Sequence, residues 1–506
     1  MRSAPVPPIG QETRDIKPLP TRALQVIGRG MQEEVINWKV LFKIGENWRN
    51  GACLRCLLHA QGTNPPCQAD APFKCSSPGL VRAQLPKMWI PRTLWVSPYN
   101  LYAHLSRLNG RIGTPGDDGP SLILMGDTAV HSSVEASSPV IRFVTPGRQT
   151  HTIHANSRSA GDQTRITALA LDQSTPCSHS RLIRLASFLS TGEFSIFTVD
   201  QHSLAASSRI IAYHPSHRTE RTAPIIQAAY YHPILLTLSA AFVLCIYDLA
   251  EPNKVKHLQT LSSFTSYPPT SIVLSPAHGT RNVLKVVLVF SVPVYPRHWS
   301  VGVTELLIKL GDDLDGIFTL PTLISTRTVR TFDLPLRWID EDQLMTIQEQ
   351  WGRKVEKVVD TQTDGKWVVL APLSASASSS SYRRNRPTSF SNALQQFRLT
   401  LPATPSAGTP KLTFVRYLYG PESDVEKIWV ADGRCVSLSV DGGIWVWDLE
   451  ERPQGAKGSK ELMWLGGAQV EIGDNPSWEG RGSVVFDERR IATVRGGEVE
   501  LRRFDV

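Results

Sequence analysis

Four of the seven cysteines of this chain lie close together near its N-terminus, where thiolates could hold a metal ion. Cys53 and Cys56 form a C-x2-C pair, and Cys67 and Cys75 follow at a wider spacing, with His59 nearby. Thiolates in such a register can reach the tetrahedral geometry of zinc. The second pair is wide and lacks the glycines of a zinc knuckle, so free structural thiols are the favoured interpretation. We therefore expect no metal and no other cofactor, and keep the four cysteines as weak zinc candidates.

The sequence carries no signature of a catalytic site. It has no G-x-S-x-G, no phosphate-binding loop, no H-E-x-x-H and no complete dinucleotide fingerprint. Gly28-Arg29-Gly30 lacks both a third glycine and a preceding strand, so it is expected to be a loop. His151 and His154 lie in a Ser/Thr-rich stretch and are expected to be solvated. The sequence therefore predicts a protein that is not an enzyme.

The amino-acid composition further narrows the classes of protein to which the chain can belong. The chain has 506 residues, of which 41% are hydrophobic, so it can bury a large core. It carries 54 Lys and Arg against 46 Asp and Glu, and this mild basic excess does not indicate nucleic-acid binding. No apolar run approaches the roughly 20 residues of a membrane span, so no membrane contact is expected. Sparse, odd-numbered cysteines favour reduced thiols in the cytoplasm or the nucleus.

The N-terminal part differs in character from the rest of the chain. Residues 1–30 are rich in proline and are expected to be disordered. The next stretch, residues 31–50, contains a predicted helix from Met31 to about Asn47. Its apolar residues recur near one face of a helical period, at Val35, Trp38, Leu41 and Phe42.

From about residue 90 onward, short apolar or β-branched runs alternate with turn residues. Such a pattern is typical of an all-β sandwich, barrel or propeller. Four runs end in an apolar or aromatic stretch followed by Asp: Phe194–Asp200, Phe242–Asp248, Ile444–Asp448 and Glu498–Asp505. Another strand precedes each run, and the turns Asp441-Gly442-Gly443 and Arg495-Gly496-Gly497 can supply the positive φ of a tight hairpin.

This repeated unit resembles the blade of a WD-repeat β-propeller, most closely at Cys435–Leu449, CVSLSVDGGIWVWDL. We expect blades to end near residues 144, 200, 248, 310, 400, 448 and 505. The resemblance thus implies an all-β, WD-repeat-like propeller with seven blades over residues 51–506, preceded by the short helical segment. Gly110–Pro120 and a disordered, basic stretch at 374–391 are expected to be insertions.

Two further expectations follow from this arrangement. The last blade lacks an outer strand near the C-terminus, so a segment between residues 51 and 90 should supply it and close the ring. Ala52–Ala60 and Gly79–Leu85 are the candidates. Trp445 and Trp447 alternate onto one face of their strand and should pack between blades.

The segment Asn37–Cys53, NWKVLFKIGENWRNGAC, carries a second resemblance. It looks like the end of an F-box and the connector that follows it in F-box/WD-repeat proteins. The matching residues are Trp38, Leu41, Phe42, Asn47, Trp48, Arg49, Gly51 and Cys53. The segment ahead of Trp38 is short and lacks most of the F-box pattern, so the expectation is a truncated or degenerate F-box. The other interpretation is a plain amphipathic helix packed beneath the propeller.

The resemblance implies a substrate-recognition subunit of an SCF-type, cullin-RING ubiquitin ligase. Trp38, Leu41 and Phe42 would contact a Skp-type adaptor, which links the chain to the cullin scaffold. A protein substrate would bind the face formed by the turns between the second and third strands of the blades. The candidates there are Ser190, Glu193, Asp441 and Arg495, with only Arg495 basic among them. The alternative is a WD-repeat scaffold for protein–protein interaction with no ubiquitin-ligase role.

Overall fold

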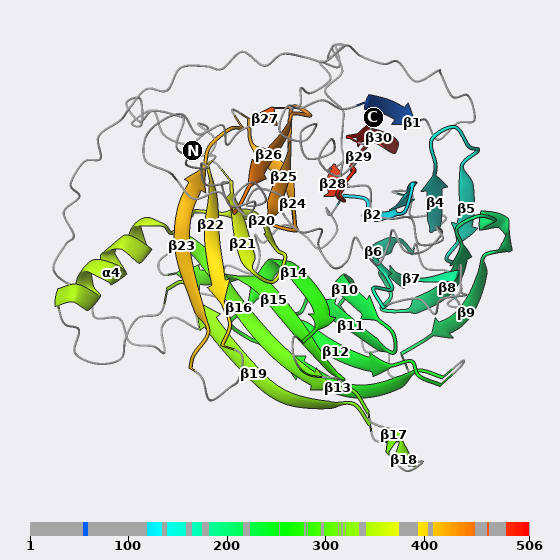
Figure 1. The fold of residues 1–506 in the computed structure, drawn as a ribbon, viewed down its shortest axis with the longest axis horizontal. Coiled ribbons are helices and arrows are strands. Elements are labelled where there is room, and N and C mark those ends of the chain that lie inside the picture. The colour runs from blue at the N-terminus through cyan, green and yellow to red at the C-terminus, as the bar shows by residue number, and fades with distance from the viewer. Residues whose placement is uncertain are drawn as a thin grey trace, which may run out of the picture.

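The computed structural model describes Leu54–Leu58 and, with gaps in several connecting segments, residues 119–504. Within these residues the chain forms seven four-stranded sheets that follow one another around a ring (Figure 1). The protein is therefore a seven-bladed β-propeller, and the prediction of an all-β propeller fold is confirmed.

The first three blades consist of consecutive strands. Blade 1 contains β2 (Leu122–Met125), β3 (Thr128–Ser132), β4 (Val140–Val144) and β5 (His151–His154). Blade 2 contains β6 (Ile166–Leu171), β7 (Leu182–Leu189), β8 (Phe194–Asp200) and β9 (Ser208–Tyr213), with the 3₁₀ helix η1 (Leu204–Ala206) between the last two. Blade 3 contains β10 (Ile225–Tyr231), β11 (Ile234–Ser239), β12 (Val243–Asp248) and β13 (Lys256–Ser262).

The next three blades carry extra elements. Blade 4 contains β14 (Tyr267–Pro276), β15 (Val283–Val294), β16 (His298–Lys309) and β19 (Thr322–Arg330), and a small hairpin of β17 (Asp313–Leu314) and β18 (Ile317–Phe318) projects from it. The helix α4 (Glu341–Gly352) precedes blade 5, which contains β20 (Val358–Thr363), β21 (Trp367–Pro372), β22 (Leu394–Thr400) and β23 (Lys411–Leu418). Blade 6 contains β24 (Val425–Ala431), β25 (Arg434–Ser439), β26 (Ile444–Asp448) and β27 (Met463–Trp464).

Blade 7 joins the two ends of the described chain. Its strands from the C-terminal part are β28 (Ser483–Phe486), β29 (Arg490–Arg495) and β30 (Glu498–Arg503), and its fourth strand is β1 (Leu54–Leu58). Leu54 pairs with Arg503 and Leu58 with Val499 in antiparallel register. Closure of the ring by a strand from the predicted segment Ala52–Ala60 is thus confirmed.

The blades are in phase with the expected repeat. The third strand of each blade ends at or within two residues of the seven expected positions, from Val144 in blade 1 to Arg503 in blade 7. The first strands, which lie innermost in the ring, contact one another in an unbroken cycle from β2 through β28 and back to β2. Because the first strands of consecutive blades are neighbours, each repeat of the sequence corresponds to one blade of the ring.

The core lies between neighbouring sheets, because each blade is covered on both faces. Val436, Ile444 and Val446 of blade 6 pack against Val484 and Ile491 of blade 7, and all five are buried. Successive side chains of a strand therefore point to two faces that are both buried. They do not alternate between a buried face and a solvent-exposed one. This is why the strands read as apolar runs with only weak alternation.

Glycine is required at the hairpin of the best-formed repeat. Gly442 lies between β25 and β26 with φ of +86°, a backbone conformation that L-residues with side chains rarely adopt. Its neighbour Asp441 accepts a hydrogen bond from the Gly443 backbone N–H at 2.9 Å. The predicted Asp-Gly-Gly hairpin is therefore present.

The helix α4 was not predicted, because the chain from about residue 90 onward was expected to consist of short strands separated by turns. It is the only α-helix among the described residues. No helix of these residues is long and apolar enough to cross a membrane. The predicted helix from Met31 to Asn47 lies outside the described residues. So do most of Gly110–Pro120, all of 374–391, and the domain limits drawn at residues 30 and 50.

Candidate functional site

The turns between second and third strands share one side of the propeller with the connections between blades. We call this side the hairpin face. In three blades the turn donates a backbone hydrogen bond of 2.8–2.9 Å to the residue that leads into the first strand: Ser190 N to Arg165 O, Ala240 N to Pro224 O and Val440 N to Asp424 O. The hairpin face is therefore a set of turns fixed by main-chain bonds to the connections beside them.

Ser190 and Glu193 occupy one turn of blade 2, and the side chains of both form hydrogen bonds within the propeller. The Glu193 carboxylate is buried, accepts a hydrogen bond from Ser157 Oγ at 3.0 Å and lies 3.5 Å from His214 Nε2. Ser190 Oγ accepts a hydrogen bond from the Arg165 backbone N–H at 3.3 Å. Glu193 thus connects the turn to the chain segments that enter and leave blade 2.

Arg495 links blades 6 and 7. Its guanidinium pairs with Glu426 Oε2 at 2.9 Å and also donates to the backbone carbonyls of Ser439 and Val440. Asp441 follows Val440 directly and is the exposed member of the four candidates. The structure therefore brings Asp441 and Arg495 onto neighbouring turns, while Ser190 and Glu193 lie in a different blade.

Trp447 and Trp445 pack between blades, as predicted. Trp447 is only 1% exposed and lies in a core cluster with Trp367, Leu394 and Leu418 of blade 5. Its indole N–H donates to the Tyr419 carbonyl at 3.3 Å. Trp445 is half-buried and packs against the same cluster.

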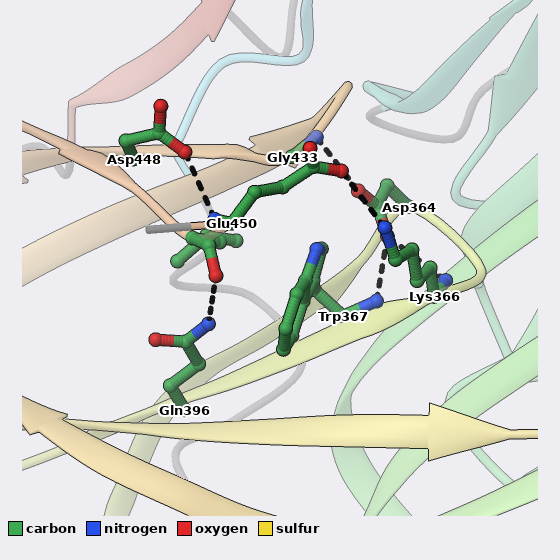
Figure 2. A network of polar contacts seen from close by, with 8 residues as sticks. Asp364, Lys366, Trp367, Gln396, Gly433, Asp448 and Glu450 are labelled. Carbon is green, nitrogen blue, oxygen red and sulfur yellow. Dashed lines mark hydrogen bonds and ion pairs between the residues drawn. The ribbon is translucent and has the colours of Figure 1, made fainter. Parts of the chain in front are cut away.

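The opposite face of the propeller carries a polar network between blades 5 and 6, shown in Figure 2. Asp364, in the turn between β20 and β21, accepts hydrogen bonds from the backbone N–H groups of Lys366 and Trp367 at 2.9 and 2.7 Å. Its other carboxylate oxygen accepts from the Gly433 N–H of blade 6 at 2.9 Å. The Lys366 ammonium then pairs with Glu450 Oε1 at 2.9 Å. The network holds two blades together at their turns.

A buried acid strengthens the same junction. Asp360 of β20 accepts from the Ile428 backbone N–H of β24 at 3.2 Å and pairs with Lys427 at 3.2 Å. Burial raises the pKa of the Asp360 carboxyl, and the Lys427 charge acts in the opposite direction. Burial likewise raises the pKa of the nearby Cys435 thiol, so this cysteine is an inert core residue.

Most of the other predicted site residues lie outside the described residues. These are the adaptor candidates Trp38, Leu41 and Phe42 and the weak zinc candidates Cys53, Cys67 and Cys75. The fourth zinc candidate, Cys56, lies in β1 and pairs with Leu501 of β30 in the backbone register. Among the residues that the structure does describe, no group of three or more His, Cys, Asp or Glu could hold a metal ion.

Two exposed apolar features of the described chain were missed from the sequence. Phe264, between β13 and β14, is 84% exposed, and Met345 of α4 is 62% exposed. The local sequence carries an indication of each of these two features. Phe264 is an aromatic residue within a run of Ser and Thr, and Glu341–Gly352 lacks the β-branched alternation of the strands around it.

Comparison with known proteins gives the family. Residues 140–393, just over half of the chain, match the family model described as F-box protein pof12 beta-propeller. No curated protein matches the chain.

Similar solved structures include Sqt1 of Saccharomyces cerevisiae, with 8% identity and a TM-score of 0.37, covering 74% of this chain and 81% of that one. A chain of the mitotic checkpoint complex shows 11% identity and a TM-score of 0.37, covering 78% and 91%. A computationally designed protein, Ika8, shows 11% identity and a TM-score of 0.34, covering 76% and 96%. On the evidence of the family model, the chain belongs to the family of F-box protein pof12 β-propellers.

Proposed function

We propose that this chain is the substrate-recognition subunit of an SCF-type, cullin-RING ubiquitin ligase. The observation that carries the proposal is the match of more than half of the chain to a family of F-box protein propellers. The connector-like segment Asn37–Cys53 supports it from the sequence.

The proposed role is positioning and not chemistry. A Skp-type adaptor and a cullin hold the chain by its N-terminal segment, and the propeller holds a protein substrate. Fixing the substrate near the loaded ubiquitin carrier raises the effective concentration of its lysines, which needs no catalytic residue on this chain. The proposal includes a cytoplasmic or nuclear location, where free thiols such as Cys245 and Cys435 stay reduced.

Adaptor binding tests the proposal. The full chain is mixed with a purified Skp-type adaptor, and the pair is examined by pull-down and calorimetry. The variant with Leu41→Asp and Phe42→Asp should lose binding, because two charges replace the apolar face proposed for the adaptor. Leu182→Asp, at a 49% exposed leucine of β7, is the matched control and should bind normally.

The alternative is a propeller scaffold with no ubiquitin role. No binding of the adaptor to the unmodified chain would favour it. Normal binding by the double variant, in which both Leu41 and Phe42 are replaced, would contradict the proposed contact residues. Unfolding of the propeller in that variant would show that the helix packs against the propeller itself.

A further inference from the structure

The lysines of the described chain are unevenly divided between the two faces of the propeller. Consecutive strands of a blade are antiparallel, so the first and third strands run from the hairpin face to the opposite face and the second and fourth strands run back. Six described lysines lie at or near the opposite-face ends of strands, or in the turns there: Lys254, Lys256, Lys285, Lys309, Lys366 and Lys411. The other three, on the hairpin side, are Lys354, Lys357 and Lys427.

Of the three lysines on the hairpin side, Lys357 alone combines exposure with the lack of a side-chain contact among the described residues. The Lys427 ammonium pairs with the buried Asp360 at 3.2 Å. The Lys354 ammonium lies 4.0 Å from the centre of the Trp351 ring. Lys357 is exposed, and its side chain forms no hydrogen bond or ion pair with the residues that the structure describes. Its amine is therefore accessible to a reagent or to another protein.

A backbone hydrogen bond fixes Lys357 on the hairpin face. Lys357 directly precedes β20, and its carbonyl accepts a hydrogen bond of 2.9 Å from the N–H of Leu373, which directly follows β21. Arg165, Pro224 and Asp424 occupy the same position in blades 2, 3 and 6, and each accepts a bond from its turn. The main chain at Lys357 is thus held on the face proposed for a substrate, while the side chain stays exposed.

Positive charge in the neighbouring part of the ring is carried by arginine. Residues 88–253, which include blades 1 and 2 and most of blade 3, contain twelve Arg and no Lys. The basic residue in the hairpin turn of blade 7 is Arg495. A guanidinium stays protonated, whereas the amine of lysine can accept an acyl group such as ubiquitin. The described part of the hairpin face therefore keeps basic charge but offers few amines for acylation.

The direction of β1 indicates which face an adaptor leaves open. Leu54, the first residue of β1, pairs with Arg503 at the opposite-face end of β30. The proposed adaptor segment, residues 37–53, therefore leads into the propeller at the opposite face. Under the proposed function the substrate binds the hairpin face, and the ubiquitin carrier must reach its lysines there. A carrier in that position can also reach Lys357.

We propose that Lys357 is a site at which the assembled ligase ubiquitinates this chain. The Lys357 amine attacks the carbonyl carbon of the thioester that joins ubiquitin to the cysteine of the carrier. A C–N bond forms, the C–S bond breaks, the carrier thiolate leaves, and the proton of the amine passes to solvent. The inference rests on the proposed function and adds a form of regulation to it, because a chain with no substrate on its hairpin face presents this amine to the carrier.

Amine labelling tests the accessibility of Lys357 in the isolated full chain, without any ligase component. The chain is treated briefly with an N-hydroxysuccinimide ester, and the label at each lysine is quantified by mass spectrometry. Lys357 should react at least fivefold faster than Lys427, whose ammonium is paired with Asp360. A smaller ratio would overturn the proposal, because the amine would then not be available to the carrier.

A reconstituted reaction tests the modification itself. The full chain is incubated with the Skp-type adaptor, the cullin-RING core, a ubiquitin carrier, the activating enzyme, ubiquitin and ATP. After trypsin digestion, the glycylglycine remnant is quantified at each lysine. Its occupancy at Lys357 should exceed that at Lys354, the control on the hairpin side, and that at Lys411, the control at the opposite face, at least fivefold. A lower ratio, or no remnant at Lys357, would overturn the proposal.

Lys357→Arg keeps the positive charge and removes the amine. This variant should lower the initial rate of self-ubiquitination at least twofold, whereas Lys411→Arg should leave the rate unchanged. Both side chains are exposed, so the melting temperature and the binding of the adaptor should be the same in both variants. An unchanged rate in the Lys357 variant would overturn the proposal.

Adaptor binding, measured on the same preparations, separates this inference from the proposed function. If the adaptor binds and the complex is active but Lys357 stays unmodified, only the proposed site is overturned. If the unmodified chain does not bind the adaptor, the ligase role is overturned and the proposed site with it.

Discussion

Asp364 Oδ2 of blade 5 accepts a hydrogen bond of 2.9 Å from the backbone N–H of Gly433 in blade 6. The other oxygen of the same carboxylate closes its own turn by accepting from Lys366 and Trp367. One side chain thus fixes both the shape of a turn and the position of the next blade. Similar contacts recur elsewhere, since Asp172 of blade 2 accepts from the His232 N–H of blade 3 at 3.0 Å.

Asp364→Ala should destabilise the propeller by about 2–4 kcal/mol, because three backbone donors lose a charged acceptor. The measurement is the denaturant midpoint in urea. Lys366→Ala is the control from the same network. The Lys366–Glu450 pair is exposed, so its loss should cost less than about 1 kcal/mol. Equal effects of the two changes would contradict the role given to Asp364.

Trp447→Ala should cost about 3–5 kcal/mol, because it empties a fully buried site between blades 5 and 6. Soluble protein and melting temperature should both fall. Trp445→Ala, in the same strand, should cost less because Trp445 is only half-buried. A Trp447 variant of normal stability that had lost a binding partner would show that the tryptophan belongs to a recognition surface.

Strand β1 should be required for stability. Replacing both Cys56 and Leu57 with proline removes at least one hydrogen bond from the antiparallel ladder, whichever of the two residues donates to β30. We expect a lower melting temperature and aggregation through the exposed edge of β30. The double change to serine keeps both N–H groups and should be tolerated far better. Two variants of equal stability would place the closing strand elsewhere.

Acid should weaken the fold through His131. Burial, with a further contribution from the Arg142 charge, lowers the pKa of His131 to about 4. The unfolded chain binds the proton near pH 6.5, so between these values the unfolded state holds more protons and stability falls as the pH falls. The contribution is at most about 3 kcal/mol, present above pH 6.5 and lost by about pH 4. His131→Gln should flatten the stability curve in this window, and an unchanged slope would exclude His131 as the cause.

Much of the fold could be predicted because its repeats leave local marks. The Asp-Gly-Gly turn and the aromatic-Asp ends are set by hairpin geometry and by the period of the blade, so they appear in a single sequence. The packing of Trp447 between blades could also be predicted, because both faces of a propeller strand are buried.

The surface features could not be predicted in the same way. Glu193 and Arg495 looked available for a substrate because they lie in turns, yet their partners Ser157 and Glu426 come from other parts of the chain. Such contacts depend on how neighbouring blades meet, which no local pattern records. The exposure of Phe264 also depends on tertiary structure, because an aromatic residue in a loop is more often covered.

The pairing of Leu54 with Arg503 determines when the ring can close during synthesis of the chain. The ribosome must make the roughly 450 residues that separate the two strands before β1 can pair with β30, which takes on the order of a minute at about 5–20 residues per second. During that time blades 1 to 6 can form in order, but the ring stays open and β1 has no strand to pair with. The nascent protein is therefore exposed to proteolysis and aggregation at β1 until β30 has been made and pairs with it.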